Sequence, residues 1–245
     1  MIKNVIYIKN DIGEKNKLTL SLPRVLADAK LSPRVKHPLP SSSGFGLAIV
    51  GSAGSGKTST LVSLIKSKDG YRKRFHNIIT VIPESSLNSL QSNPFKDLDA
   101  SNRYETLDME TLSEIIEKVE ANKEEGEITL LILDDVSAEL QDPLILKKLT
   151  RLFLNRRHLG LSIIAIAHSL QGKGSLPYTV RKNMSHLILF RQSSGMDQLN
   201  HEILHLKKDK FSELMNYVYD KPHNHLMIKF NTLDLYKNFN TLQLQ

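Results

Sequence analysis

The stretch that decides the fold is Leu47–Thr58, which reads LAIVGSAGSGKT. Its first four residues form an apolar run typical of a parallel strand that is buried on both faces. The next eight residues match the pattern G-x-x-x-x-G-K-[ST], in which the glycines let the backbone bend around phosphate oxygens. Leu61, Leu64 and Ile65 follow at helical spacing and predict a helix over about residues 57–66. A strand, this loop and a helix in succession predict an anion site made by backbone N–H groups and the helix N-terminus.

Each position of this loop predicts a contact with a nucleoside triphosphate. Lys57 is expected to bridge the β- and γ-phosphates, and the Thr58 hydroxyl is expected to be a ligand of Mg²⁺. ATP and Mg²⁺ are therefore the predicted cofactors. The residues predicted to bind the nucleotide are Gly51, Ser52, Ala53, Gly54, Ser55, Gly56, Lys57, Thr58 and Ser59.

A second motif supports the first. Residues 129–135 read TLLILDD, an apolar strand that ends in the carboxylates Asp134 and Asp135. Ligands of open α/β sheets bind beyond the carboxyl ends of the strands, so these acids are expected beside the phosphate loop. Asp134 is predicted to hold Mg²⁺, and Asp135 to orient or deprotonate the attacking water.

A third strand-like run, residues 162–167, also ends in polar groups, His168 and Ser169. A side chain at this position can sense the γ-phosphate, which makes His168 a candidate sensor. A histidine at the end of a buried strand can equally be a structural hydrogen-bond partner. Both readings of His168 stay open at the level of sequence.

Strand-like runs alternate with helix-like segments through the rest of the chain. Leu112, Ile115, Ile116 and Val119 recur at i, i+3, i+4 and i+7 and define one apolar helical face. Such alternation implies βαβ crossovers. It predicts an α/β fold, a P-loop NTPase with a doubly wound, mostly parallel sheet and helices on both faces. After the phosphate loop, the strand-like runs are residues 78–82, 130–133, 162–167 and 187–190.

The predicted domain organisation is an N-terminal arm and lead-in at residues 1–43, followed by one ATPase domain at 44–245. The arm contains β-like runs at 5–8 and 18–22, then prolines, and residues 41–44 are expected to be flexible. Within the domain, residues 85–103 predict a long loop. Beyond residue 195 we expect a helix-like stretch and an edge strand at 226–230.

Composition restricts the function classes. The 245 residues contain no cysteine, which excludes thiolate zinc sites and cysteine nucleophiles. No run reaches the roughly 18 to 20 apolar residues of a membrane helix, and the first residues lack the apolar run of a secretion signal. We therefore expect a soluble protein with no membrane partner. The formal net charge of +7 favours contact with a polyanion.

With these motifs the chain resembles the FtsK/HerA-type genome-packaging ATPases of large DNA viruses and their virophages, within the additional-strand class of P-loop ATPases. The resemblance covers about residues 44–192. Besides the two motifs above, it rests on Arg156–Ser162 (RRHLGLS) and on Pro177 through Arg181–Asn183. The chain departs from relatives outside the viral group in having Asp135 where they have glutamate, and His168 where they tend to have glutamine.

The resemblance implies a ring of subunits around double-stranded DNA, with the strand at 162–167 placed between the strands that end at Val50 and Asp134. It also implies that an arginine from a neighbouring subunit stabilises the γ-phosphoryl charge. Arg157 or Arg156 is the first candidate and Arg181 the second. A viral capsid protein is the implied partner. The implied location is the virus-producing compartment of an infected cell, a cytoplasmic virus factory, with incorporation into the virion as a further option.

Three other functions remain open from sequence. A nucleotide kinase has the same phosphate loop, and a non-motor assembly protein can bind ATP with negligible turnover. The sharpest rival is a zinc metalloprotease, because His201–His205 reads HEILH and satisfies H-E-x-x-H, with Glu213 or His223 as a third ligand.

Overall fold

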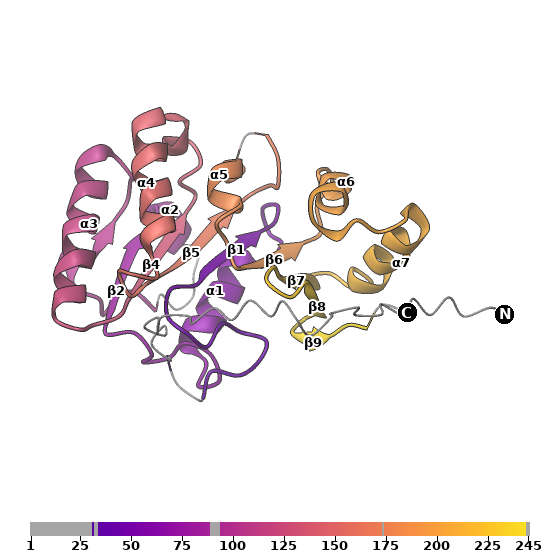
Figure 1. The fold of residues 1–245 in the computed structure, drawn as a ribbon, viewed down its shortest axis with the longest axis horizontal. Coiled ribbons are helices and arrows are strands. Elements are labelled where there is room, and N and C mark those ends of the chain that lie inside the picture. The colour runs from indigo at the N-terminus through magenta and orange to yellow at the C-terminus, as the bar shows by residue number, and fades with distance from the viewer. Residues whose placement is uncertain (1–30, 32–33, 89–93, 173, 244–245) are drawn as a thin grey trace, which may run out of the picture.

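The computed structural model describes residues 31, 34–88, 94–172 and 174–243 (Figure 1). The described strands form one sheet in the order β3-β2-β4-β5-β1-β6-β7-β8-β9. Strands β3 through β6 in this order pair in parallel, whereas β7, β8 and β9 are added antiparallel. The strands are β1 Gly46–Val50, β2 Asn77–Val81, β3 Arg103–Tyr104, β4 Thr129–Asp134, β5 Leu161–Ala167, β6 His186–Phe190, β7 His225–Lys229, β8 Asp234–Lys237 and β9 Asn240–Thr241.

Helices cover both faces of this sheet (Figure 1). Side chains of β1 alternate between the two faces: Leu47 and Ile49 pack in the cluster that contains Leu61 and Leu64 of α1. Ala48 and Val50 belong to the opposite cluster, which includes residues of α3, α4 and α7. The predicted α/β fold with a mostly parallel, doubly wound sheet is therefore confirmed. The helices are α1 Lys57–Lys66, α2 Glu84–Asn88, α3 Met109–Glu124, α4 Pro143–Asn155, α5 Tyr178–Arg181, α6 Met196–Leu199 and α7 Lys208–Val218.

The two long helices of one face begin at residues suited to that position. The Asp108 carboxylate accepts a hydrogen bond from the Thr111 backbone N–H at 2.7 Å and caps α3. The Asp142 carboxylate accepts from the Leu144 N–H at 2.7 Å, and Pro143 supplies the first residue of α4. The crossovers that follow β3 and β4 are thus set locally by sequence.

Strand β5 lies between β4 and β1, as the resemblance implied. Ala165 pairs with Leu133 on one side and with Ala48 on the other. Because the three strands are parallel, their carboxyl ends reach the same edge of the sheet. The phosphate loop, the paired aspartates and His168 therefore emerge next to one another.

Three sequence expectations differ from the structure, and a fourth falls outside the residues it describes. The strand predicted at the edge, β7, is internal, because it pairs with both β6 and β8. The loop predicted at 85–103 includes α2, a 3-10 turn at Ala100–Asn102 and β3. The lead-in predicted as flexible is packed: Ser43 is buried, and the Gly44 N–H donates to the Ser162 hydroxyl at 3.1 Å. The β-like runs at 5–8 and 18–22 lie outside the described residues.

Candidate active site

The phosphate loop is shaped by two glycines that no other residue replaces easily. At Gly51, an added Cβ would lie 2.3 Å from the Ser55 hydroxyl oxygen and 2.9 Å from Phe190 Cβ. Gly56 has a φ of 107°, a left-handed value that side chains disfavour. The Gly51 N–H donates to the Ala167 carbonyl at 3.1 Å, which joins the start of the loop to the end of β5. The loop is thereby fixed against the two strands beside it.

Lys57 lies at the start of α1 and is buried, with 7% of its surface exposed. Its ammonium donates to the Ser52 carbonyl at 3.0 Å, across the loop. Burial lowers the pKa of Lys57, while the charges of Asp134 and Asp135 act in the opposite direction. Lys57 is therefore within electrostatic reach of both aspartates, as the two motifs predicted.

Asp134 ends β4 and is also buried. Its burial and the neighbouring Asp135 charge raise its pKa, whereas Lys57 and His168 lower it. A buried carboxylate whose pKa is raised in this way would be stabilised by a cation placed beside it.

Asp135 and His168 meet at the tips of β4 and β5. The His168 Nε2 lies 3.3 Å from the Asp135 Oδ1, and each side chain is 45% exposed. Asp135 has a φ of 56°, and such backbone strain in a non-glycine residue is concentrated at functional positions. The candidate sensor and the candidate base are thus in direct contact, which the sequence did not indicate.

Arg156 and Arg157 lie away from the phosphate loop of their own chain. They precede β5, and the start of β5 is beside the start of β1, since Gly46 pairs with Ile163. The loop follows the other end of β1, about 16 Å further along a five-residue strand. Neither Arg156 nor Arg157 is therefore brought to the loop within one chain. Arg181 donates to the Leu170 carbonyl, in the segment that follows β5.

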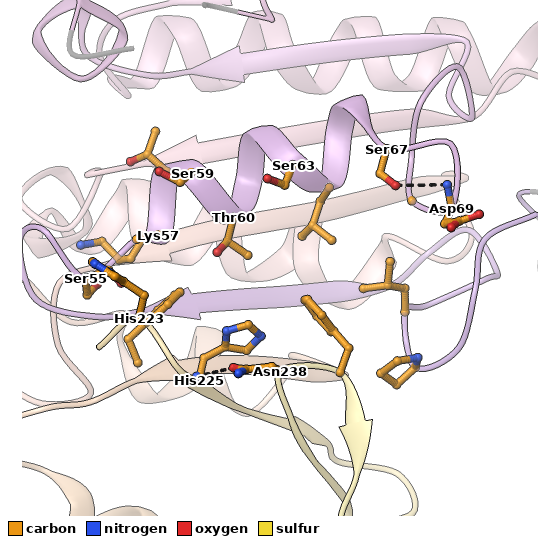
Figure 2. Close-up of a pocket in the computed structure, with 18 of the residues that line it drawn as sticks. Ser55, Lys57, Ser59, Thr60, Ser63, Ser67, Asp69, His223, His225 and Asn238 are labelled. Carbon is orange, nitrogen blue, oxygen red and sulfur yellow. Dashed lines mark hydrogen bonds between the residues drawn. The ribbon is translucent and has the colours of Figure 1, made fainter. Parts of the chain in front are cut away.

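A cavity of about 940 Å³ lies beside the phosphate loop and is lined by residues of the loop and of α1 (Figure 2). It extends along α1, and residues of β7 and of the turn after β8 line its opposite wall, among them His225 and Phe239. His223 reaches the loop itself, with its Nδ1 3.1 Å from the Ser55 carbonyl oxygen. The sequence named His223 only as a candidate zinc ligand and did not place it at the phosphate loop, because 168 positions separate it from Ser55.

The metalloprotease alternative is not supported. His201 and Glu202 lie in a π-helical turn, Asn200–Leu204, and His205 follows with a left-handed φ of 51°. The motif therefore lacks the regular helix that would place both imidazoles on one face. Across the described part of the chain, no group of three or more His, Cys, Asp or Glu side chains is arranged to hold a metal ion.

The family model described as "Poxvirus A32 protein" matches residues 38–233. The chain belongs to the poxvirus A32 protein family. The match spans the phosphate loop, both aspartates and His223, and it confirms the viral group that the sequence resembled.

Solved structures agree with the fold of this A32-family chain. It is similar to the genome packaging NTPase B204 of Sulfolobus turreted icosahedral virus 2 in complex with ATP-gammaS, with a TM-score of 0.56 and 14% identity over 82% of this chain and 98% of that one. The B204 complex with AMPPCP gives a TM-score of 0.54 and 16% identity, over 82% and 99%. EssC (ATPases 2 and 3) of Geobacillus thermodenitrificans gives 0.53 and 20%, over 76% and 38%. A search of curated proteins found no match.

In the segments that the structure describes, no helix combines the length and the apolar character needed to span a membrane.

Proposed function

We propose that the protein is an ATP-hydrolysing motor that moves double-stranded DNA into a viral capsid. The observation that carries the proposal is the convergence of Lys57, Asp134 and Asp135 at one edge of the sheet. There Asp134 pairs with Ile166 of β5, and the Gly51 N–H at the start of the loop donates to the carbonyl of the next residue, Ala167. Family membership and the fold shared with a genome packaging NTPase support the packaging role.

In this proposal the loop from Gly51 to Ser59 surrounds the triphosphate, and Lys57 neutralises charge on the β- and γ-phosphates. Asp135 orients the attacking water and accepts its proton. The water oxygen bonds to the γ-phosphorus as the bond to the bridging oxygen of ADP breaks, so the products are ADP and phosphate. His168 acts as a positioning residue, because its Nε2 is 3.3 Å from Asp135 Oδ1.

The site fits Mg²⁺. Asp134 is a buried carboxylate whose raised pKa reflects burial and a second nearby acid. Thr58, the second residue of α1, carries a hydroxyl oxygen that can be a metal ligand. One or two protein oxygens with phosphate oxygens are the usual ligands of Mg²⁺ in such sites. Thr58 and Asp134 would hold the ion, which supplies charge stabilisation at the β- and γ-phosphates when bound.

The protein is proposed to act as a homo-oligomeric ring. Arg156 and Arg157 lie at the edge of the sheet opposite the phosphate loop, so a contribution to catalysis requires a neighbouring subunit. Arg157 or Arg156 is the first candidate for this role in trans and Arg181 the second. A viral capsid protein is the proposed partner.

Family membership indicates a protein made in a virus-infected cell. Within that cell, the proposed location is the cytoplasmic virus factory, with incorporation into the virion as an extension of the same role.

An ATPase assay with and without duplex DNA tests the motor. We expect phosphate release to depend on Mg²⁺, to increase when linear duplex DNA is added, and to be abolished by Lys57→Ala. Stimulation should weaken steeply as salt is raised, because contacts with the DNA backbone release counterions. Hydrolysis that is unaffected by DNA at any salt concentration would contradict the motor.

Product analysis separates the remaining alternatives. A kinase would transfer the labelled γ-phosphate of ATP to an added nucleotide acceptor, whereas the motor releases all of it as inorganic phosphate. An assembly protein would bind ATP and change its oligomeric state without turnover.

A further inference from the structure

The cavity beside the phosphate loop has the size and composition of a ligand site. Its volume of about 940 Å³ is at the upper end of the range for small-molecule pockets. Gly56 and Thr60 line it from the loop and α1, and His225 and Phe239 line it from the C-terminal strands. Figure 2 shows Thr60 and His225 on opposite walls. Lys57 and Thr58 also line it, so the cavity is continuous with the phosphate loop.

A direct contact joins the C-terminal strands to the loop. His223 precedes β7, and its Nδ1 is 3.1 Å from the Ser55 carbonyl oxygen. A carbonyl only accepts, so Nδ1 carries the proton and donates. His223 adopts a left-handed φ of 63°, which places this ring beside the loop at a cost in backbone strain. This contact ties the start of β7 to the phosphate loop.

Phe239 occupies a backbone position that normally belongs to glycine. Asn238 and Phe239 form the two-residue connection between β8 and β9, and their φ values are 48° and 70°. Two-residue turns with both φ values positive strongly favour Asn-Gly. A phenylalanine retained in the glycine position is strained, and strain of this kind marks functional sites. The ring is partly exposed and lines the cavity.

His225 brings an unused hydrogen-bond acceptor to the cavity wall. Its ring lies between Phe190, at a centroid distance of 5.3 Å, and Phe239, at 4.8 Å. Burial lowers its pKa to about 4, and a hydrogen bond to the His223 backbone opposes that shift, so a ring N–H is donated there. The buried Nε2 has no hydrogen-bond partner among the described residues. In the neutral ring with one N–H donated, Nε2 is an acceptor.

We propose that this cavity holds the nucleobase of bound ATP, with the base against the Phe239 ring and its exocyclic amino group donating to His225 Nε2. Adenine carries an amino donor at the position where guanine carries a carbonyl oxygen, so the same contact selects ATP over GTP. The proposal rests on the proposed function, because it assumes that the triphosphate occupies the loop.

Binding of ATP and of inorganic tripolyphosphate, both with Mg²⁺, tests the proposal by titration calorimetry on the full chain. In Phe239→Gly we expect the Kd for ATP to rise about tenfold, because stacking on an aromatic ring is lost. The Kd for tripolyphosphate should stay within about twofold, since the phosphate contacts are unchanged. Relief of backbone strain offsets lost packing, so the melting temperature should change little.

Leu233→Gly is the matched control. Leu233 is exposed and has a left-handed φ of 54° in the turn between β7 and β8, outside the cavity lining. This variant relieves the same kind of strain and should bind ATP as the wild type does. Equal ATP affinity in Phe239→Gly and the wild type would overturn the base site. A wild type that binds neither ATP nor tripolyphosphate would instead overturn the proposed function.

His225→Phe tests the selectivity. It keeps an aromatic ring between Phe190 and Phe239 but removes the acceptor. We expect the ratio of GTP to ATP dissociation constants to fall toward one, while tripolyphosphate binding stays unchanged. An unaltered ratio would show that His225 does not read the base.

Discussion

Replacing Gly51 with alanine tests whether the phosphate loop depends on its close packing against β6. The new Cβ would meet the Ser55 hydroxyl oxygen at 2.3 Å and Phe190 Cβ at 2.9 Å. The hydroxyl can rotate away, but Phe190 Cβ is attached to the backbone of a buried strand, so the loop itself must move. Overpacking of this kind costs about 1–3 kcal/mol. At about 2–4 °C per kcal/mol for a chain of this size, a cost of about 2 kcal/mol lowers the melting temperature by about 4–8 °C.

Thermal unfolding and ATP titration, run side by side, measure this effect. We expect Gly51→Ala to lose both stability and ATP affinity, and Gly51→Ala with Ser55→Ala to recover only part, because the Phe190 contact remains. Gly126→Ala is the matched control: Gly126 has a φ of 78°, and none of the described atoms lies within 4 Å of its added Cβ. It should lose some stability through backbone strain but keep wild-type ATP affinity. A Gly51→Ala protein with the melting temperature and ATP affinity of the wild type would refute this reasoning.

Three further predictions follow from the site and the buried histidines. Lys57→Ala should reduce ATP hydrolysis at least about a hundredfold with an unchanged circular dichroism spectrum, because it removes a buried charge from the phosphates; measurable turnover near the wild-type rate would exclude Lys57 from catalysis. Asp135→Asn should reduce the rate constant for hydrolysis by about 10²–10⁴ and leave ATP affinity nearly unchanged, as measured by single-turnover assays; normal turnover would move the base to another residue. Stability should fall on acidification: burial lowers the pKa of His186 and of His225 from 6.5 to about 4, so the unfolded chain binds protons first. The free energy of unfolding is therefore unaffected by these histidines above about pH 6.5 and falls as the pH is lowered toward 4. At pH 5 the loss is about 2 kcal/mol per histidine. Urea denaturation at pH 7.5 and 5.0 measures the loss, which should be about 2 kcal/mol smaller in His225→Phe. An equal loss in the wild type and the variant would show that the pKa of His225 is not lowered by burial.

The parallel part of the sheet could be predicted from sequence because its signals are local. The runs that became β1, β4 and β5 are apolar over most of their length, as is typical of strands buried on both faces. Each is followed by the polar or glycine-rich residues that form the site. The proximity of Asp134 to Lys57 followed from one rule, that parallel strands present their carboxyl ends at the same edge.

The antiparallel part was predicted less well. β8 reads DLYK and β9 has only two residues, so neither has enough apolar residues to be distinguished from a loop. Without them, β7 looked like the end of the sheet. The contact between His223 and Ser55 depends on how β7 packs beside β6, which no local pattern records. The metalloprotease alternative required a regular helix at HEILH, whereas the structure has a π-helical turn at Asn200–Leu204.

The pairing of β1 has a consequence for how the protein is made. Both neighbours of this strand come much later in the chain, since Gly46 pairs with Ile163 and Leu47 with His186. At translation rates of about 5–20 residues per second, the strand that carries the phosphate loop leaves the ribosome about 10 s before either neighbour exists. A bare apolar strand of this kind is prone to aggregation, so the nascent chain is expected to require chaperone protection until β5 has been synthesised.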